Sequence, residues 1–233
     1  MIGVIGGGGV AATNKLCELL EIRLTKNGSY RDAHHPEMLI YQATKVPSRS
    51  LYLERRGDSF IDDYIVVGKK LKAIVATILC MCCNTAHYAI IQIEQHVDLP
   101  FINIIEEVLF AVKDTRATNI GLIASDGCLK GKVYEKYFES ILPTAHIIYP
   151  NKYFQQEVTI GICGIKNTFR FLEKDHPNRP QNIFLNVYKH LIDNGAEIVV
   201  IGCTDIRVDF HHENTIDSLE ILVNKIYQMY LER

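Results

Sequence analysis

The sequence predicts an α/β protein with parallel sheets. Short apolar segments alternate along the chain with longer segments in which apolar residues recur at helical spacing. The short segments are apolar at nearly every position, as in strands that are covered on both faces. Strands and helices that alternate in this way form parallel sheets, with the connecting helices packed on the sheet faces.

Each element follows from one of two patterns. A short run of mostly apolar residues predicts a buried strand. The predicted strands are residues 1–5, 38–42, 73–81, 119–124, 145–149 and 197–201. Apolar residues at every third or fourth position predict a helix that faces a core. The predicted helices are residues 10–26, 60–71, 85–95, 105–112, 132–141, 181–194 and 217–231. Ser59 and Asp217 are expected to cap the helices that follow them, and Gly195 to lie just beyond the helix that ends at Asn194.

The composition is that of an ordinary globular protein. Of 233 residues, 48% are apolar and 22% are charged, and this length suits one large domain or two small ones. The 25 Lys and Arg nearly balance the 27 Asp and Glu, which favours neither nucleic acid nor a membrane surface as a partner.

The cysteines and the N-terminus predict a cytoplasmic protein. Seven cysteines is an odd number and two of them are adjacent, which favours a reducing compartment over a disulfide framework. The opening residues MIGVIGGGG lack a basic region followed by an apolar one, and no segment of 18 residues is continuously apolar. We therefore expect neither a leader nor a membrane span.

Two cysteine-containing segments resemble each other. They are ILCMCCNTAHYAI at residues 78–90 and IVVIGCTDI at residues 198–206. In each, an apolar run ends in cysteine, and Thr or Asn-Thr follows. Cys83 and Cys203 lie 120 residues apart, about half of the chain. This spacing indicates two duplicated α/β halves, with a boundary near residues 100–103.

Functional groups of parallel sheets gather beyond the carboxyl ends of the strands. Both cysteine motifs, the glycines at residues 6–9 and SDGC at residues 125–128 are therefore expected at one cleft. The glycines also fit the dinucleotide motif G-x-G-x-x-A, but the acidic residue that it requires about 20 positions on is missing, because Glu21 falls inside the first predicted helix. We interpret the glycines as a tight turn that brings backbone N–H groups close to a carboxylate.

A zinc site is the first alternative for the cysteine-rich segment. Cys80, Cys82, Cys83 and His87 form a Cys₃His set of zinc ligands. In a strand, however, side chains alternate between faces, so Cys80 and Cys82 point to one face and Cys83 to the other. This alternation disfavours a metal site.

Most of the cysteines are interpreted as small core residues. These are Cys17, Cys80, Cys82 and Cys163, while Cys128 stays undecided. Cys83 and Cys203 differ, because each ends an apolar run and precedes a predicted helix. The unpaired N–H groups of a helix's first turn favour a thiolate and lower the thiol pKa. Two such thiols in one cleft predict that one removes a proton from a carbon and the other returns one to the opposite face, which inverts the carbon.

Eight motifs lie along nearly the whole chain. They are GVIGGGGVAAT at 3–13, VPSRSLY at 46–52, CNTAH at 83–87, IIEE at 104–107, GLIASDG at 121–127, VYEKYF at 133–138, GIKN at 164–167 and GCTDI at 202–206. In these motifs and their order, the sequence resembles the cofactor-independent aspartate/glutamate racemase family, and within it the aspartate racemases. The paired CNTAH and GCTDI motifs are the specific part of the resemblance.

The resemblance implies two pseudo-symmetric three-layer α/β domains, each with a parallel four-stranded sheet, and an active site in the cleft between them. The first domain would comprise residues 1–102 and 208–233, and the second residues 103–207. The resemblance also implies a homodimer, no cofactor, and Cys83 and Cys203 as the paired acid and base.

Further residues of the site are expected to bind the substrate. They are Arg49, Asn84, Thr85, Ser125, Lys166, Thr204 and Gly8. Arg49 and Lys166 match the family's ligands of the substrate carboxylates. The hydroxyl and amide side chains are expected to donate hydrogen bonds to the α-carboxylate as it becomes enolate-like. Lys166 is expected in a polar loop, where movement would gate the site.

Departures from the family's pattern fall at positions near the ligand. Gly8 and Val10 stand where Met and Pro are common, YQAT at residues 41–44 stands in place of an Asp/Asn-rich stretch, and Cys128 stands in place of a Thr. The sequence predicts racemisation of aspartate first and glutamate second, without pyridoxal phosphate or metal. The nearest alternative is an enzyme of the maleate isomerase or arylmalonate decarboxylase type. The alternative from another class is a silent binding protein for an acidic metabolite.

Overall fold

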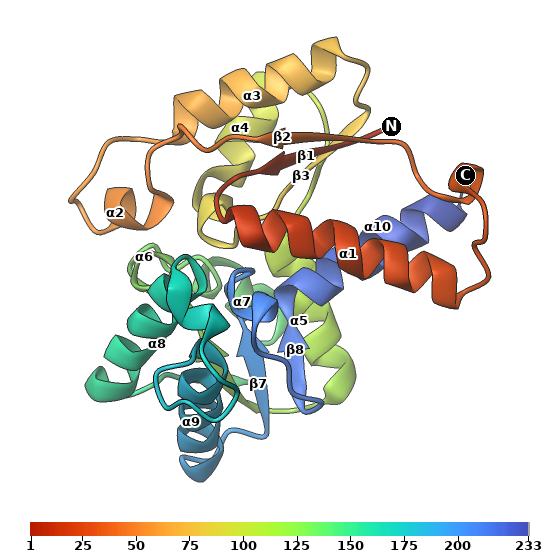
Figure 1. Ribbon diagram of the computed structural model, residues 1–233. Coiled ribbons are helices and arrows are strands. Elements are labelled where there is room, and N and C mark those ends of the chain that lie inside the picture. The colour runs from red at the N-terminus through yellow and green to blue at the C-terminus, as the bar shows by residue number, and fades with distance from the viewer. Residues whose placement is uncertain (233) are drawn as a thin grey trace.

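The structure, a computed structural model, describes residues 1–232. These residues form two sheets of four parallel strands, in the orders β2-β1-β3-β4 and β6-β5-β7-β8. Figure 1 shows the two sheets in separate halves of the molecule, with helices around each. The predicted α/β class with two parallel four-stranded sheets is confirmed.

The first sheet is built around a completely buried central strand. Its strands are β1 (Ile2–Gly6), β2 (Met38–Gln42), β3 (Ile78–Met81) and β4 (Phe101–Ile102). β1 pairs with β2 on one side and with β3 on the other, and all of its residues are buried. This burial on both faces is what its uninterrupted apolar pattern predicts.

Helices cover both faces of the first sheet (Figure 1). Those of the first half are α1 (Val10–Lys26), α2 (Arg49–Leu53), α3 (Ile61–Ala73) and α4 (Ile90–Val97). α3 and α4 bury Ile65, Leu71 and Ile93 against one face, together with Leu79 of β3. α1 covers the other face and shares its apolar core with the C-terminal helix.

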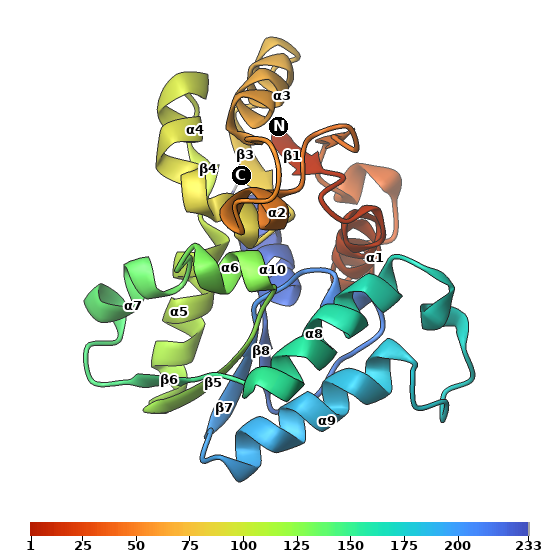
Figure 2. The ribbon, with the colours of Figure 1, turned by 90° about the vertical axis from the view of Figure 1, so that its left-hand side faces the viewer.

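The second sheet has the same architecture. Its strands are β5 (Asn119–Ile123), β6 (His146–Ile148), β7 (Ile198–Ile201) and β8 (Thr215–Asp217). Its helices are α5 (Ile104–Thr115), α6 (Asp126–Lys130), α7 (Glu135–Ile141), α8 (Lys152–Ile165) and α9 (Pro180–Asp193). Figure 2 shows α5 and α7 on one side of this sheet and α8 and α9 on the other.

The C-terminal helix α10 (Ser218–Leu231) returns from the second sheet to the first half, as expected. It packs against α1 and α5, and Leu222 and Ile226 are fully buried. β8 precedes it and pairs with β7, so residues 215–217 belong to the second sheet, although the expected boundary at residue 208 assigned them to the first domain. Three residues with one fully apolar side chain give too short a pattern to predict a strand. Residue 233 of the expected first domain lies outside the described residues.

Several element boundaries differ from the predicted ones. The third strand begins at Ile78 rather than at residue 73, and the predicted helix 85–95 begins as a 3₁₀ turn, Thr85–Ala89, before α4. The helix expected after Cys203 is only the three-residue 3₁₀ turn Ile206–Val208. The helix α8 was not predicted at all.

Two of the three expected caps are confirmed. Asp217 accepts hydrogen bonds from the N–H groups of Leu219 and Glu220, and Gly195 has a φ of +92° just beyond the end of α9. Ser59 accepts from the N–H of Ile61, but the N-cap position of α3 is Phe60.

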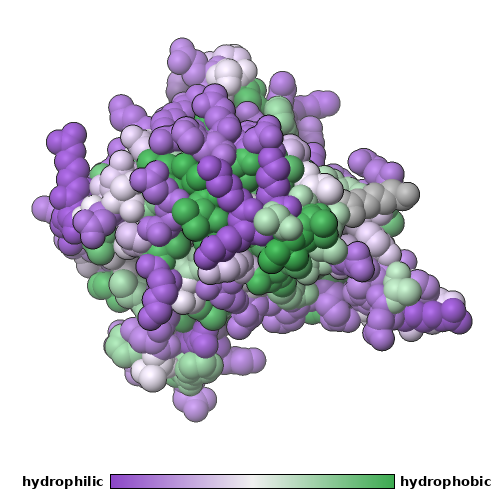
Figure 3. Space-filling model, turned by 90° about the horizontal axis from the view of Figure 1, so that it is seen from above, coloured by the Kyte–Doolittle hydropathy of each residue, from purple (hydrophilic) through white to green (hydrophobic). Residues whose placement is uncertain are grey.

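Figure 3 views the molecule from above, the side on which α3 and α4 lie. Polar and charged side chains cover most of this face, with separate apolar areas between them. Exposed apolar residues of this half include Val66 of α3 and Ile91 of α4. Among residues 1–232, no helix combines the length and the apolar character that crossing a bilayer requires.

Candidate active site

A cavity of about 280 Å³ lies between the two halves. Its walls come from segments that follow the carboxyl ends of β1, β3, β5 and β7, and from α2 and α8. All nine residues predicted for the site line it, namely Gly8, Arg49, Cys83, Asn84, Thr85, Ser125, Lys166, Cys203 and Thr204. The structure therefore brings the predicted residues together, while their chemical roles stay predictions.

The two thiols reach the cavity from corresponding strands of the two sheets. Cys83 follows β3, and Cys203 follows β7. Both cysteines are free and partly exposed. The segments around them touch, because the Thr204 hydroxyl donates to the backbone carbonyl of Cys82 over 3.2 Å. One thiol from each half thus borders the same space.

The surroundings of Cys203 differ from those predicted. Burial raises the pKa of the Cys203 thiol to about 12, and Asp205 raises it further, while Lys166 acts in the opposite direction. The expected lowering of the pKa by a following helix is wrong for Cys203, first because the thiol is buried and second because Asp205 lies beside it. A raised pKa favours the protonated thiol, which is the form of a proton donor.

Arg49 occupies the first position of α2 and is buried. Its Nη2 donates to the carbonyl of Gly8 over 2.8 Å, and its Nη1 donates to the carbonyl of Pro47 over 3.1 Å. Its Nε is buried without a hydrogen-bond partner in the protein. A buried guanidinium with an unused donor is suited to an anionic ligand.

Gly8 makes room for this guanidinium. A Cβ at Gly8 would lie 3.0 Å from Nη2 of Arg49 and 3.3 Å from Cβ of Cys83. A longer side chain, such as the Met expected at this position, would push against both groups. The departure at Gly8 therefore fits the packing of this particular site.

Lys166 ends helix α8 instead of lying in a polar loop. Its Nζ is 3.1 Å from Oδ2 of Asp205, a buried residue that sequence analysis did not assign to the site. Oδ1 of Asp205 is buried without a hydrogen-bond partner, and a Cβ at Gly9 would lie 1.8 Å from it. The absence of a side chain at Gly9 is thus what lets this carboxylate approach the turn after β1. The acidic residue in the GCTDI motif was the available signal.

The predicted hydrogen-bond donors are partly engaged within the protein. The amide of Asn84 donates to Oγ of Ser218 over 2.8 Å and accepts from the Tyr134 hydroxyl over 2.9 Å. The hydroxyls of Thr85 and Ser125 lie 3.0 Å apart and connect the two halves. Asn84 is therefore fixed in place by its own contacts, and its remaining N–H is the part that is free for a ligand.

A further contact between the halves closes one wall of the cavity. The N–H of Gly127, in α6, donates to Oγ of Ser50, in α2, over 2.9 Å. A Cβ at Gly127 would lie 2.3 Å from Cα of Ser50. The glycine lets α2, which carries Arg49, approach α6 closely.

The cavity is also lined by charged residues that sequence analysis did not select. Glu54 pairs with Arg56, and Asp126 accepts from Thr159 and Gln155. With Arg49, Lys166 and Asp205, the lining carries three cationic and three anionic side chains.

The other cysteines divide between core and surface. Cys80, Cys82 and Cys128 are buried, as expected for the first two. Cys163 was expected in the core but is exposed and lines the cavity, because α8 directs it there. Cys17 is partly buried, with its thiol 3.4 Å from the carbonyl of Thr13.

Both ring nitrogens of His87 contact backbone groups, one of them in the first cysteine segment. Its Nδ1 is 2.9 Å from the carbonyl of Cys83, and its Nε2 accepts from the N–H of Ile104. Burial lowers the pKa of His87 to about 4, so the ring is neutral. Throughout the part of the chain that the structure describes, no three His, Cys, Asp or Glu side chains are grouped to hold a metal ion.

The fold and the cavity define a protein of two similar α/β halves that each present a cysteine to a shared site. Residues 2–226 match the family described as Asp/Glu/Hydantoin racemase. The chain therefore belongs to this family of isomerases, and the resemblance seen in its motifs is confirmed.

Similar proteins are racemases of several amino acids. The broad specificity amino-acid racemase RacX of Bacillus subtilis (strain 168) is 22% identical over 99% of this chain and 98% of its own. A glutamate racemase of Staphylococcus haemolyticus is 23% identical, over 72% of this chain and 60% of its own.

Solved structures share the fold. The aspartate racemase of Picrophilus torridus superposes with a TM-score of 0.81 at 20% identity, covering 98% of this chain and 93% of its own. The glutamate racemase of Francisella tularensis subsp. tularensis SCHU S4, in complex with D-glutamate, gives a TM-score of 0.62 at 16% identity, covering 99% and 81%.

Proposed function

We propose that the protein racemises an acidic amino acid, aspartate first and glutamate second, with Cys83 and Cys203 as the two acid–base groups and without a cofactor. The observation that carries the proposal is that one thiol from each half lines a single small cavity in a member of a racemase family.

In the proposed reaction, one cysteine thiolate takes the α-proton and the other cysteine, as a thiol, gives a proton to the opposite face of the α-carbon. The C–H bond on one face breaks and a new one forms on the other, so the carbon is inverted. The first cysteine ends protonated and the second ends as a thiolate, and proton exchange with solvent restores the starting state. The raised pKa of Cys203 suits the donor in this cycle.

The α-carbon is a weak acid, so the site must stabilise the negative charge that develops on the carboxylate. Arg49 supports this role, because its guanidinium is already oriented by two backbone carbonyls and keeps a free buried donor. Thr85 and Ser125 add a pair of hydroxyls at the cavity wall, one of which donates to the other and leaves the second as a donor for the substrate. The hydroxyl of Thr204 already donates to the carbonyl of Cys82. Preorganised donors such as Arg49 need little rearrangement as the charge forms.

A wider range of amino-acid substrates is the second candidate. It is favoured by the three carboxylates of the lining, which balance its three cationic side chains, so a dicarboxylic substrate meets no net positive charge there.

One experiment tests both candidates. The purified protein is incubated with each L-amino acid and with no added cofactor, and products are separated by chiral chromatography. Formation of D-aspartate or D-glutamate, undiminished by a chelator or a carbonyl reagent and abolished by thiol alkylation, is the expected result. Turnover of uncharged or basic amino acids at a similar rate would favour the wider range, and no turnover of any amino acid would contradict the racemase. We also propose that the protein is a cytoplasmic homodimer. Sedimentation of the purified protein tests whether it is a dimer.

A further inference from the structure

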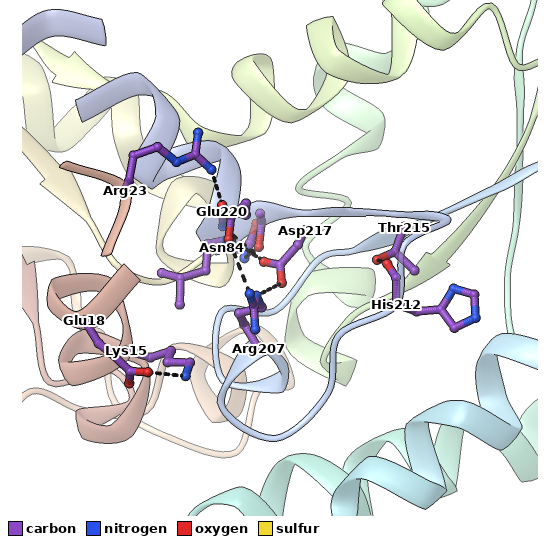
Figure 4. Close-up of polar contacts among 11 residues, drawn as sticks. Lys15, Glu18, Arg23, Asn84, Arg207, His212, Thr215, Asp217 and Glu220 are labelled. Atoms are coloured by element: carbon purple, nitrogen blue, oxygen red, sulfur yellow. Dashed lines mark hydrogen bonds and ion pairs between the residues drawn. The ribbon is translucent and has the colours of Figure 1, made fainter. Parts of the chain in front are cut away.

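Residues at the start of α10 contact the Cys83 segment and the turn that follows the Cys203 segment. We call residues 82–84 the Cys83 loop and residues 202–205 the Cys203 loop. Asp217 caps α10 and Ser218 is its first residue, and both side chains are buried. Figure 4 shows Asp217 pointing toward Arg207, with Asn84 close by.

Ser218 anchors the Cys83 loop. Its hydroxyl accepts the 2.8 Å hydrogen bond from Asn84, the residue directly after Cys83. The other end of the Asn84 amide is held by Tyr134. Both Asn84 and Ser218 are almost completely buried, so water does not compete for this contact.

Asp217 anchors the segment that follows the Cys203 loop. Its Oδ2 is 3.0 Å from Nε of Arg207, an ion pair whose two atoms are not aligned for a hydrogen bond, while its Oδ1 accepts the two N–H groups at the start of α10. Arg207 lies in the 3₁₀ turn that begins with the hydrogen bond from the N–H of Ile206 to the carbonyl of Cys203. Arg207 is thus connected to the backbone at Cys203 through this turn.

The outer side of Arg207 is also fixed. Glu220 lies 3.4 Å from Nη2 of Arg207 and pairs in addition with Arg23 of α1 (Figure 4). The ion pairs thus run from α1 through α10 to the turn after Cys203.

A buried ion pair is poor evidence for a role in stability, because desolvation of the charges offsets much of their attraction. Burial raises the pKa of Asp217 to about 7, even though Arg207 acts to lower it. The raised pKa reflects the same cost of desolvation. Asp217 could cap α10 from an exposed position at less cost. What the ion pair adds is an attraction that holds the turn with Arg207 close to the start of α10.

We infer that the Asp217–Arg207 ion pair and the Ser218–Asn84 hydrogen bond act together to fix the Cys203 loop relative to the Cys83 loop. Asp217 and Arg207 are then positioning residues for the reaction of the two thiols, an interpretation that rests on the proposed function. The fixed geometry of the loops can be measured without it.

Asp217→Asn removes the ion pair but keeps the helix cap, because Asn is as good an N-cap as Asp but carries no charge. The matched control is Glu107→Gln, which breaks the 2.7 Å ion pair between Lys225 of α10 and Glu107 of α5, a pair that touches neither loop. Arg207→Met and the double variant Asp217→Asn/Arg207→Met complete a mutant cycle, in which contacting residues are expected to be non-additive.

The first readout is the rate of alkylation of each cysteine by iodoacetamide, resolved by peptide mass spectrometry at about pH 8.5, where Asp217 is ionised. In Asp217→Asn and Arg207→Met, Cys203 should react at least about fivefold faster, the change that about 1 kcal/mol of lost restraint gives. Cys83 should change by less than about twofold in the same samples, and Glu107→Gln should match the wild type at both cysteines. Equal reactivity of Cys203 in wild type and in the folded Asp217→Asn variant overturns the inference, whether or not the protein is a racemase.

The second readout is catalytic. Exchange of the α-proton of one enantiomer with D₂O needs one aligned thiol, whereas racemisation needs both. In Asp217→Asn, the loss of kcat for racemisation should therefore be about tenfold greater than the loss in the rate of exchange through Cys83. KM should be nearly unchanged. An equal loss of both activities would indicate general destabilisation and would overturn the positioning role. Absence of turnover in the wild type contradicts the proposed function, and the alkylation rates then decide the inference alone.

Discussion

Nζ of Lys166 lies 3.1 Å from Oδ2 of Asp205, beside the thiol of Cys203. The cation that was predicted to bind a substrate carboxylate is thus already paired with a carboxylate of the protein. A substrate that uses Lys166 must compete with Asp205, and both groups act on the pKa of Cys203 in opposite directions.

Asp205→Asn should therefore lower the pKa of Cys203. Asp205 raises this pKa, and Lys166, once relieved of its partner, lowers it. The thiolate fraction at a given pH rises, so the pH midpoint of Cys203 alkylation should move downward, as peptide mass spectrometry over a pH series would show. KM for aspartate should fall as well, and an unchanged midpoint would mean that Asp205 has no electrostatic effect on this thiol.

Arg49→Lys should not be a conservative change. Lys cannot contact the carbonyls of Gly8 and Pro47 and still present a planar donor pair to a carboxylate. We expect kcat/KM for aspartate to fall on the order of 10²-fold or more. Arg56→Lys is the matched control, since Arg56 is exposed and pairs with Glu54 at the cavity wall. If the two variants lose activity equally, Arg49 has no special role.

Cys83→Ala and Cys203→Ala should each abolish racemisation while leaving substrate binding largely intact. A single thiol returns the proton to the face from which it came, so inversion needs both. Each variant should still exchange the α-proton of one enantiomer with D₂O, and the two variants should prefer opposite enantiomers in an NMR assay. Cys163→Ser is the control, because Cys163 lines the same cavity from α8. Residual racemisation in either alanine variant would contradict the two-thiol mechanism.

Gly9→Ala should destabilise the protein through one contact. The added Cβ would lie 1.8 Å from Oδ1 of Asp205, so the turn after β1 or the Cys203 segment must shift. A loss of about 1–3 kcal/mol in the free energy of unfolding is typical of such overpacking. Asp205→Ala should restore most of it in the double variant, as denaturant unfolding would show. Without that rescue, the strain arises elsewhere.

Local patterns were sufficient to predict six of the strands and the edge at which the site lies, whereas the four-stranded sheets were predicted from the family resemblance. Buried parallel strands such as β1 are apolar throughout, and the positions after their carboxyl ends meet at one edge. β4 and β8 were missed because β4 has only two residues and β8 has a single apolar one, so neither forms a pattern of its own.

Helix α8 was missed for a different reason. Its residues 152–165 include two glycines and several β-branched residues, which weaken the helical pattern, although Asn151 caps it. This omission also misplaced Cys163 in the core and Lys166 in a loop. The pKa of Cys203 could not be predicted either, since it depends on burial and on Asp205, which only the folded chain brings together.

The position of α10 ties the active site to the order of synthesis. α1 leaves the ribosome well before α10, which covers its apolar face. The first sheet can form early, whereas its α1 side stays exposed until the second half has been translated and folded. Since Asp217 and Ser218 come with α10, the loops that carry the two thiols reach their final arrangement only after α10 has been made. A chain truncated before α10 is therefore expected to carry both cysteines without a working site.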